Sequence, residues 1–581
     1  MKRILCFLMV LLLALPVSVK AESADYDAAM EIETAASALV REGKAKGAIL
    51  SVVKDGKALM CQGFGHADEY NGIAADPKTT AFRIGSVSKT FVAVAAMVAV
   101  QEGKVDLDKD IAQYLGADCP KLSYPVTMKQ LLTHTAGFED MVTGMAVKNV
   151  SDTEPLSLTV HKYLPKQVFR PGEISSYSNY GIALVAYVVE KAMGQSFLDF
   201  CRERVFLPLN MNHTTFAYMH DTAFVSKPYL PDGRETLEPY MNLYPEGSAV
   251  STAADMAIYM TWLMDLSDAR VLSSTSKETL FARHFSMAED LAGLCLGFNR
   301  KERNGHVYYD KKGETLHFYS RIALYPDKGM GVFLSYNTYL PEEEINAVMG
   351  KALDLIYGEA RTEAISEHGF DIAGLYVNSW SSFTTPEKLL RYIIPGKMIS
   401  IVKSPESGYT LSGIPIIPIG ENLYRTPIGK SKFLKQNGTV ILATETAVTY
   451  QKVAPWQQPI LLFIVPVAFL LAALCVFLRE GVCYMRKSRR GNLLLLTLSG
   501  VQLFFMGVLL YLLYIGIMTF SLLSYIWLFK LCGFSILIAA VAGAVHVEHT
   551  RIKRRLFLML PTIWSLTGIL FTAWMGWMNL I

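Results

Sequence analysis

The feature that most constrains this sequence is a series of four apolar stretches in its C-terminal part. A helix of roughly 20 residues crosses the hydrocarbon core of a bilayer, and each stretch is long enough to do so. The stretches are Ile460–Leu478, Leu493–Ile515, Leu522–Val545 and Leu556–Ile581. We therefore expect residues 458–581 to form a transmembrane region of about four helices, and the rest of the chain to fold in water.

Basic residues mark two of the three connections between these stretches. Connections rich in lysine and arginine stay in the cytoplasm. The first carries Arg479, Arg486, Lys487, Arg489 and Arg490, and the third carries Arg551, Lys553, Arg554 and Arg555. The second has no charge. This pattern predicts a multi-pass protein of the cell membrane, with residues 22–457 and the C-terminus outside the cytoplasm.

The N-terminus has the order of segments of a secretory signal. A charged start, Met1–Arg3, precedes the apolar run Ile4–Val17 and the small-residue site Val19–Ala21. This order predicts a signal peptide over residues 1–21. An uncleaved N-terminal anchor is the alternative, although the apolar run is shorter than a bilayer requires. Export agrees with the topology that the basic connections indicate.

Charge and cysteine usage limit the functions open to the exported part. The formal net charge is only +3, and no basic face indicates a nucleic-acid partner. Cys61, Cys119, Cys201 and Cys295 are widely spaced and form no Cys-x-x-Cys pair, so no metal site is expected. One or two disulfides and four isolated core cysteines both remain open.

The exported part divides into two units by its hydrophobic pattern. Residues 22–360 alternate strand-like runs such as Ala48–Val53 with helix-like runs such as Thr90–Gln101 and Gly181–Met193, which predicts a mixed α and β domain. Residues 361–457 hold short β-rich runs separated by Gly and Pro. These runs predict a small antiparallel β domain between the larger domain and the membrane.

The pattern Ser-x-x-Lys occurs four times, and three copies lack a suitable setting. Ser51 and Ser400 lie in strand-like runs, where residues three apart point to opposite faces and cannot share a proton. Ser274 and Lys277 stand in polar surroundings that indicate a solvated helix face. The fourth copy, Ser86, is the exception.

Ser86 precedes a helix that is apolar on nearly all sides and therefore buried, Thr90–Met97. Lys89 would lie one helical turn from the serine, shielded from water. Burial disfavours the charged form of lysine, so Lys89 could lose its proton near neutral pH and act as base toward the Ser86 hydroxyl. Ser86 is thus the predicted nucleophile.

Tyr177 is the predicted proton shuttle. It follows the loop signal Pro171–Glu173 and precedes another buried helix, which sets it apart from the other Tyr-x-Asn copies at Tyr240 and Tyr376. A phenol near lysines can carry a proton between nucleophile and leaving group. A core tyrosine whose hydroxyl merely finds a partner is the alternative.

Together these motifs identify a known family. The chain over roughly residues 30–360 resembles the class C beta-lactamase and penicillin-binding-protein superfamily of serine hydrolases. The matching segments, in order, are Ser86–Lys89, Leu131–Gly137, Tyr177–Asn179 and Glu246–Met256. The resemblance implies an α/β fold, in which an antiparallel sheet flanked by helices meets a helical region at the serine. It also implies a covalent acyl-enzyme without metal or organic cofactor.

The resemblance also implies roles for further residues. Asn179 would contact substrate, His134 would pack beneath the site, and the segment 247–256 would be scaffold. A third motif should be Lys311-Lys312-Gly313, where Lys311 would hold an anionic substrate group or tune Tyr177. Lys312 is the other register, and a solvated pair of charges on a hairpin is the alternative to both.

The backbone N–H of Glu314 would pair with that of Ser86 as an oxyanion hole. The sequence departs from the family here, because Glu314–Phe318 stands where many relatives have a glycine-rich loop. This bulkier segment makes it unsafe to transfer a substrate from the relatives.

The function expected from these residues is hydrolysis, outside the membrane, of a peptide or ester containing a D-amino acid, such as a cell-wall component. Beta-lactams would be possible covalent ligands. An alternative is a peptidase that activates a secreted nonribosomal prodrug peptide. Another is a beta-lactam sensor without turnover, which the short cytoplasmic loops disfavour.

Overall fold

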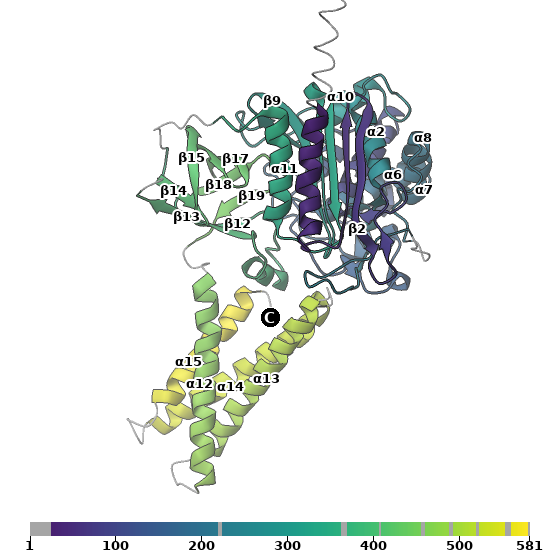
Figure 1. The fold of residues 1–581 in the computed structure, drawn as a ribbon. Coiled ribbons are helices and arrows are strands. Elements are labelled where there is room, and N and C mark those ends of the chain that lie inside the picture. The colour runs from purple at the N-terminus through teal and green to yellow at the C-terminus, as the bar shows by residue number, and fades with distance from the viewer. Residues whose placement is uncertain are drawn as a thin grey trace, which may run out of the picture.

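A computed structural model describes residues 25–218, 224–361, 369–405, 408–454, 459–486, 492–518, 522–551 and 559–578. The predicted signal peptide and most of the basic connections lie outside these ranges. The described chain forms three parts: a large α/β domain, a β-barrel, and a bundle of long helices (Figure 1).

A seven-stranded antiparallel sheet is the centre of the large domain. Its order is β3 (Ile73–Ala74), β2 (Lys57–Asp68), β1 (Gly47–Lys54), β11 (Met330–Tyr336), β10 (Tyr319–Tyr325), β9 (His306–Glu314) and β8 (Asn299–Arg303). The N-terminal and C-terminal strands are therefore neighbours, and the helical region is inserted between them.

Helices cover both faces of this sheet, because its central strands are apolar on both sides. One face packs against a helix over residues 25–41 and against α11 (Glu342–Tyr357). The other packs against α9 (Ala253–Met264), and the same core continues to α2 (Ser88–Gln101) and α6 (Asn179–Met193), which pack against each other. Alternate residues of β1 enter the two cores, as the period of a strand requires.

The β-rich segment forms a closed antiparallel barrel. Its strands are β12 (Gly374–Asn378), β13 (Met398–Ser404), β14 (Gly408–Leu411), β15 (Ile414–Gly420), β16 (Leu423–Thr426), β17 (Gly429–Gln436), β18 (Thr439–Thr444) and β19 (Thr449–Lys452). Pairing of β12 with β19 closes the ring. The predicted antiparallel β domain is confirmed, and its closure removes both exposed sheet edges.

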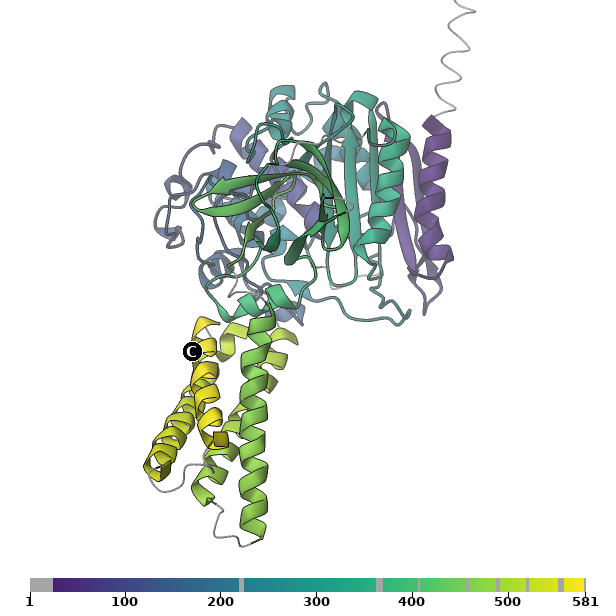
Figure 2. The same ribbon diagram turned by 90° about the vertical axis from the view of Figure 1, so that its left-hand side faces the viewer.

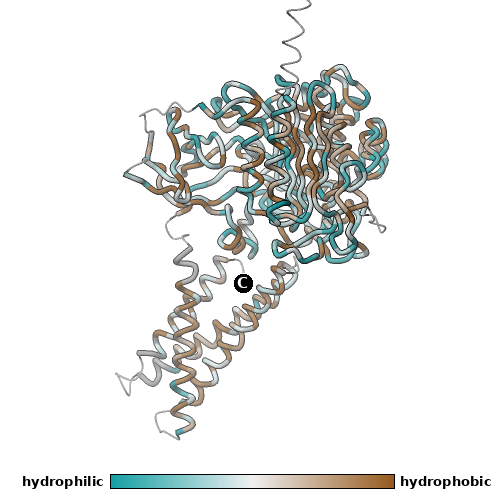
Figure 3. The backbone as a smooth tube through the Cα atoms, in the orientation of Figure 1, coloured by the Kyte–Doolittle hydropathy of each residue, from teal (hydrophilic) through white to brown (hydrophobic). Residues whose placement is uncertain are grey.

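Four helices form the C-terminal bundle: α12 (Pro459–Met485), α13 (Leu493–Met518), α14 (Ile526–Arg551) and α15 (Met559–Trp577). The first three are long and apolar enough to cross a membrane. α15 packs against α12 and α14 and completes the bundle (Figure 2). Hydropathy in Figure 3 separates these apolar helices from the mixed surface of the large domain.

A buried amide joins three of these helices. Gln502 on α13 donates to the carbonyl of Ile536 on α14 at 3.1 Å and accepts a hydrogen bond from the indole of Trp564 on α15. Lys530 is exposed in the second turn of α14, as expected of a side chain that reaches toward the interface.

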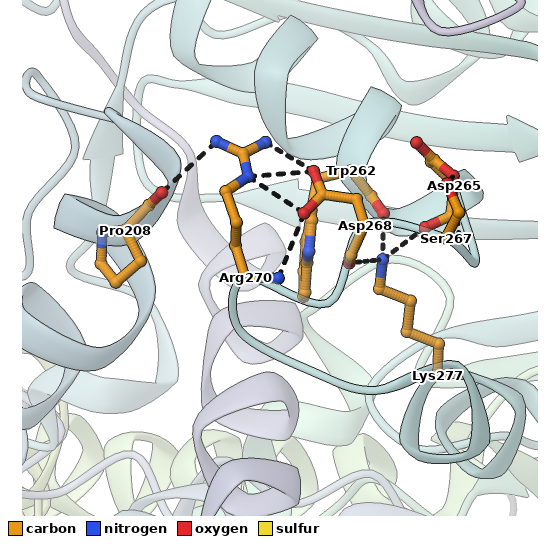
Figure 4. A network of polar contacts seen from close by, with 7 residues as sticks. All are labelled: Pro208, Trp262, Asp265, Ser267, Asp268, Arg270 and Lys277. Atoms are coloured by element: carbon orange, nitrogen blue, oxygen red, sulfur yellow. Dashed lines mark hydrogen bonds and ion pairs between the residues drawn. The ribbon is translucent and has the colours of Figure 1, made fainter.

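The setting predicted for Lys277 is wrong. Its side chain is buried, and its ammonium donates to the carbonyls of Trp262, Asp265 and Asp268 at 2.6, 2.6 and 2.8 Å (Figure 4). These carbonyls lie at the end of α9 and just beyond it, where helical carbonyls lack partners within the helix. Lys277 therefore stabilises the C-terminal end of α9. The polar residues around Lys277 in the sequence do not indicate this buried role.

The four cysteines of the large domain are free thiols. Cys201 and Cys295 are buried, and Cys61 and Cys119 are partly buried. Of the two possibilities left open by the sequence, the structure has isolated cysteines in or beside the core.

Candidate active site

The predicted nucleophile lies where the sheet meets the helical region. Strand β4 (Phe82–Arg83) leads into a 3-10 turn, η1 (Gly85–Val87), which continues directly into α2. Gly85 has a φ of 51°, and a Cβ there would lie 2.5 Å from the amide nitrogen of Glu314 on β9. A Cβ on Gly313 would collide with the carbonyl of Ile84. Glycine at both positions lets the two backbones touch beside Ser86.

Lys89 lies on the first turn of α2 and is completely buried. Its Nζ lies 2.8 Å from Ser86 Oγ, 2.6 Å from the carbonyl oxygen of Glu246 and 2.9 Å from Glu246 Oε2. All three contacts are hydrogen bonds that the ammonium can donate. Lys89 thus connects the serine to a buried carboxylate.

The protonation expected for Lys89 needs correction. Burial alone would lower its pKa, but the pKa is raised above the usual value because the Glu246 carboxylate and Tyr177 favour the ammonium. Lys89 is therefore charged at neutral pH and has no free lone pair with which to act as a base. The apolar residues around Lys89 in the sequence indicate that the lysine is buried. They do not indicate that the carboxylate of Glu246, far away in the sequence, lies beside it.

Glu246 is the functional residue that the sequence did not reveal. It lies on the 3-10 turn η5 (Tyr244–Glu246), at the start of a motif whose other residues are expected to be scaffold. Its carboxylate is buried and forms an ion pair with Lys89 across 157 residues of sequence. The acidic side chain at the first position of this motif was the available signal.

Tyr177 reaches the serine from the loop just before α6. Its hydroxyl lies 2.7 Å from Ser86 Oγ and donates to it. The loop is fixed from below, because Ser178 caps α6 by accepting a hydrogen bond from the amide of Gly181. The structure therefore brings Ser86, Lys89 and Tyr177 within direct hydrogen-bond contact.

His134 lies under the Tyr177 ring. The two rings stack with centroids 4.4 Å apart, and His134 Nδ1 accepts a hydrogen bond from the amide of Ser178. Burial and the positive charges of Lys311 and Lys89 hold the pKa of His134 well below its usual range. The imidazole is consequently neutral. It holds the Tyr177 ring in place by stacking, and it holds the backbone next to Tyr177 by accepting the hydrogen bond from Ser178.

Lys311 and Lys312 point to opposite sides of β9. Lys311 is buried with its Nζ 5.1 Å from the centre of the Tyr177 ring. Lys312 faces outward and pairs with Glu314 and Glu342. Burial and the neighbouring Lys89 lower the pKa of Lys311 to about 7. Of the two registers considered, the structure places Lys311 at the site.

Asn179 is the first residue of α6 and lies next to the predicted shuttle in sequence. Its Nδ2 contacts Met145 Sδ at 3.5 Å. Its Oδ1 is buried, and within the described parts of the chain no donor reaches it.

The barrel contributes a side chain that the sequence did not suggest. Trp380, just after β12, packs edge-on against Tyr177 with ring centroids 5.0 Å apart. The neighbouring Ser379 hydroxyl donates to the carbonyl of Ser175, and its own carbonyl accepts from Ser176. These bonds fix the barrel beside the loop that carries Tyr177.

Comparison with known proteins agrees with this arrangement. A family model described as Beta-lactamase matches residues 32–352, more than half of the chain. Protein flp of Staphylococcus aureus (strain MW2) is 28% identical over 197 residues, which cover 33% of this chain and 39% of that protein. Putative penicillin-binding protein PbpX of Bacillus subtilis (strain 168) is 25% identical over 235 residues, covering 40% and 57%.

Among solved structures, the octameric penicillin-binding protein homologue from Pyrococcus abyssi matches with a TM-score of 0.49 and 20% identity. The match covers 73% of this chain and all of that one. The matched part of this chain spans less than two thirds of each of the two curated relatives. On the extent of the family match, this chain belongs to the beta-lactamase family of serine hydrolases and penicillin-binding-protein-like proteins.

Proposed function

We propose that this protein is a membrane-anchored hydrolase that forms an acyl-enzyme on Ser86 and acts outside the cytoplasm on peptides or esters containing a D-amino acid. One observation carries the proposal. Ser86 Oγ lies 2.8 Å from the Lys89 ammonium and 2.7 Å from the Tyr177 hydroxyl. A serine held between a cation and a phenol is arranged for nucleophilic catalysis.

Before the proposed reaction, Tyr177 releases its phenolic proton to solvent. In the first step Ser86 Oγ attacks the carbonyl carbon of the substrate, and the serine proton passes to the Tyr177 phenolate oxygen. Lys89 stabilises a phenolate at that oxygen, because Glu246 keeps the ammonium charged. The new Oγ–C bond forms as the bond to the leaving group breaks. Tyr177 then gives the proton to the departing amine or alcohol.

In the second step, water attacks the acyl-enzyme and Tyr177 accepts one of its protons. The acid leaves, and the proton returns to Ser86 Oγ. The amides of Ser86 and Glu314 would stabilise the oxyanion in both steps, since the backbones meet at Gly85. No group other than substrate and water is needed for this cycle.

Two features support a substrate with an amide and an acidic group. The unpartnered Oδ1 of Asn179 can accept a substrate N–H. Lys311 can bind a carboxylate when it is charged. The bulky segment Glu314–Phe318 borders this end of the site and would restrict the size of the acyl group.

Anchoring outside the cytoplasm is supported by the apolar helices and by the charge pattern of their connections. A peptidase acting on a secreted prodrug peptide remains within this proposal, because it would use the same chemistry. A sensor that is acylated without turnover would differ from a hydrolase in the number of substrate molecules that each protein molecule consumes.

Paired D- and L-aminoacyl esters and amides, offered to the full-length protein in nanodiscs, test the proposal. We expect multiple turnovers, preference for the D-isomer, and loss of at least a thousandfold in rate with Ser86→Ala. A stoichiometric burst without turnover would support the sensor. Turnover that is unchanged in Ser86→Ala would refute the assignment of the nucleophile.

A further inference from the structure

Large apolar side chains are exposed at one end of the seven-stranded sheet. We name this set the apolar rim: Tyr70, Ile73, Leu237, Leu316 and Tyr339. Their exposed fractions are 90%, 47%, 87%, 46% and 47% in that order. Single exposed apolar residues are ordinary on a protein surface, whereas a group gathered at one end of a domain marks an interaction surface.

The strand register places the rim on one end of the sheet. Gly47 pairs with Gly65, Ala48 with Tyr336, and Tyr319 with both Tyr336 and Glu314. The segments that leave these positions are the end of β2 with β3, the β9–β10 turn, and the chain after β11. These segments carry four of the five rim residues.

Hydrogen bonds of Glu238 place the fifth rim residue, Leu237, at the same end of the sheet. Its carboxylate is buried and accepts the amides of Leu316 and His317, both at 3.1 Å, and it also contacts His317 Nδ1 at 2.9 Å. This holds the β9–β10 turn against the segment of Glu238 and brings Leu237 to the same end.

The opposite end of the sheet has a different surface. Its turns are Asp55-Gly56, Asn304-Gly305 and Pro326–Gly329. None of these turns, all of them described by the structure, exposes a large apolar side chain. The turns at the two ends of the sheet therefore differ in the large apolar side chains that they expose.

The rim end faces the transmembrane bundle. The helix over residues 25–41 starts at the end remote from the bundle and runs toward it (Figure 1). Five residues separate the end of this helix from the start of β1. A short helix of the barrel domain, η7 (Pro386–Tyr392), approaches the same bundle. Leu389 and Tyr392 pack on the core of α12–α15, while Ile393 next to them is 62% exposed.

We infer that the apolar rim rests in the outer interface of the bilayer that holds α12–α15, so that Ser86 acts on a substrate carried by the membrane. This rests on the proposed function. Leu316 lies two residues from Glu314, whose amide adjoins Gly85 beside the nucleophile. A rim in the interface therefore brings the site to the lipid headgroups. The substrate class is an ester or amide joined to a lipid or held in the bilayer by a lipid tail.

A lipid surface is the occupant that the structure favours. Aromatic and aliphatic side chains are typical of surfaces that enter the headgroup region. The rim also continues the membrane contact that the chain's own helices provide, and these helices keep it near the bilayer at all times. A soluble protein partner would have to bind in the gap between the large domain and the membrane.

Photocrosslinking in phosphatidylglycerol–phosphatidylethanolamine nanodiscs tests the contact without any use of catalysis. A benzophenone amino acid would replace Leu237, and a matched one would replace Asn304 at the opposite end. We expect lipid adducts by mass spectrometry at position 237 and none at 304. Equal yields at both positions, or none at 237, would overturn the inference.

Two fluorophosphonate probes test the consequence for Ser86, one soluble and one attached to a phospholipid headgroup in the same nanodisc. We expect the double variant Tyr70→Glu/Leu237→Glu to react with the lipid-attached probe at least tenfold more slowly than the unmodified protein. It should react equally fast with the soluble probe. Asn304→Glu is the control and should change neither rate.

The two probes separate the two proposals. Failure of the soluble probe on the unmodified protein would contradict the proposed function, and the crosslinking yields alone would then decide whether the rim contacts lipid. Normal reaction with the soluble probe, together with no reaction with the lipid-attached one, would contradict the membrane-borne substrate alone. An equal lipid-probe rate in the double variant would do the same.

Discussion

At the scale of single residues, the proposed mechanism depends on Lys89 remaining positively charged and not on Lys89 losing its proton. Burial would discharge Lys89, and the carboxylate of Glu246 prevents this. In the proposed mechanism the base at the serine is the Tyr177 oxygen, and Lys89 acts by its positive charge. Glu246 is a positioning residue in this scheme, because it acts through Lys89.

Glu246→Gln should lower the acylation rate about tenfold or more at neutral pH, since Lys89 loses its counter-ion and its pKa falls. A lysine with a lowered pKa regains its charge as the pH falls, so the deficit relative to the unmodified protein should shrink toward acidic pH. The pH profile of labelling by a soluble fluorophosphonate measures this. A deficit that is constant with pH would indicate a merely structural role, and Glu246→Asp should recover most of the rate.

Lys311 gives a second pH dependence. Its pKa is lowered to about 7, so the side chain is charged below that pH and loses its charge above it. For an ester bearing a carboxylate, kcat/KM should fall about tenfold from about pH 6 to about pH 8, relative to a neutral analogue. Lys311→Met should abolish the difference between the two substrates. Parallel profiles in the unmodified protein would argue against binding of the carboxylate by Lys311.

At the scale of elements, the sequence predicted where individual helices and strands lie but not which distant segments they contact. Local periodicity predicted α2, α6 and β1 with ends that lie within two residues of the observed ones. The contact of Glu246 with Lys89 and that of Trp380 with Tyr177 join segments far apart in the chain. Local patterns carry no information on such pairs, and for the same reason they did not reveal that the barrel closes.

The Ser274–Lys277 copy of the motif illustrates this limit. Lys277 has the same spacing from a serine as Lys89, yet its ammonium bonds three carbonyls at the end of α9. Lys277→Met should lower the free energy of unfolding by about 1–3 kcal/mol, because it leaves buried carbonyls without donors. The unfolding midpoint of the protein in detergent measures this. Ser274→Ala is the matched control, and neither change should alter the rate of Ser86 labelling.

Substitution of Trp380 tests whether the barrel domain contributes to the reaction at Ser86. Trp380→Ala removes the ring that packs on Tyr177, and we expect at least a fivefold loss in acylation rate with an unchanged unfolding midpoint. Trp380→Phe should retain most of the rate. An unaltered rate in Trp380→Ala would restrict the barrel to a supporting role.

At the scale of the whole molecule, the three parts form a chain of contacts from the C-terminal helices to Ser86. The helix η7 contacts the bundle, Trp380 contacts Tyr177, and both belong to the barrel domain. The order of the parts was predictable from composition, because a bilayer, a barrel and an α/β core require different hydrophobic patterns. Their mutual placement was not, since it depends on surfaces formed only after each part has folded.

The predicted topology places the large domain and the barrel outside the cytoplasm. External protease should therefore digest them in right-side-out vesicles and leave a fragment containing α12–α15. In inverted vesicles the same protease should leave them intact. Protection in right-side-out vesicles would reverse the orientation and remove the basis for an extracytoplasmic substrate.

The most direct test of the proposed nucleophile is to map the residue that a soluble fluorophosphonate modifies in the full-length protein. Peptide mass spectrometry should find a single adduct on Ser86, formed slowly in Tyr177→Phe and absent in Ser86→Ala. An adduct on any other serine, or unchanged labelling of Ser86→Ala, would contradict the claim that Ser86 is the nucleophile.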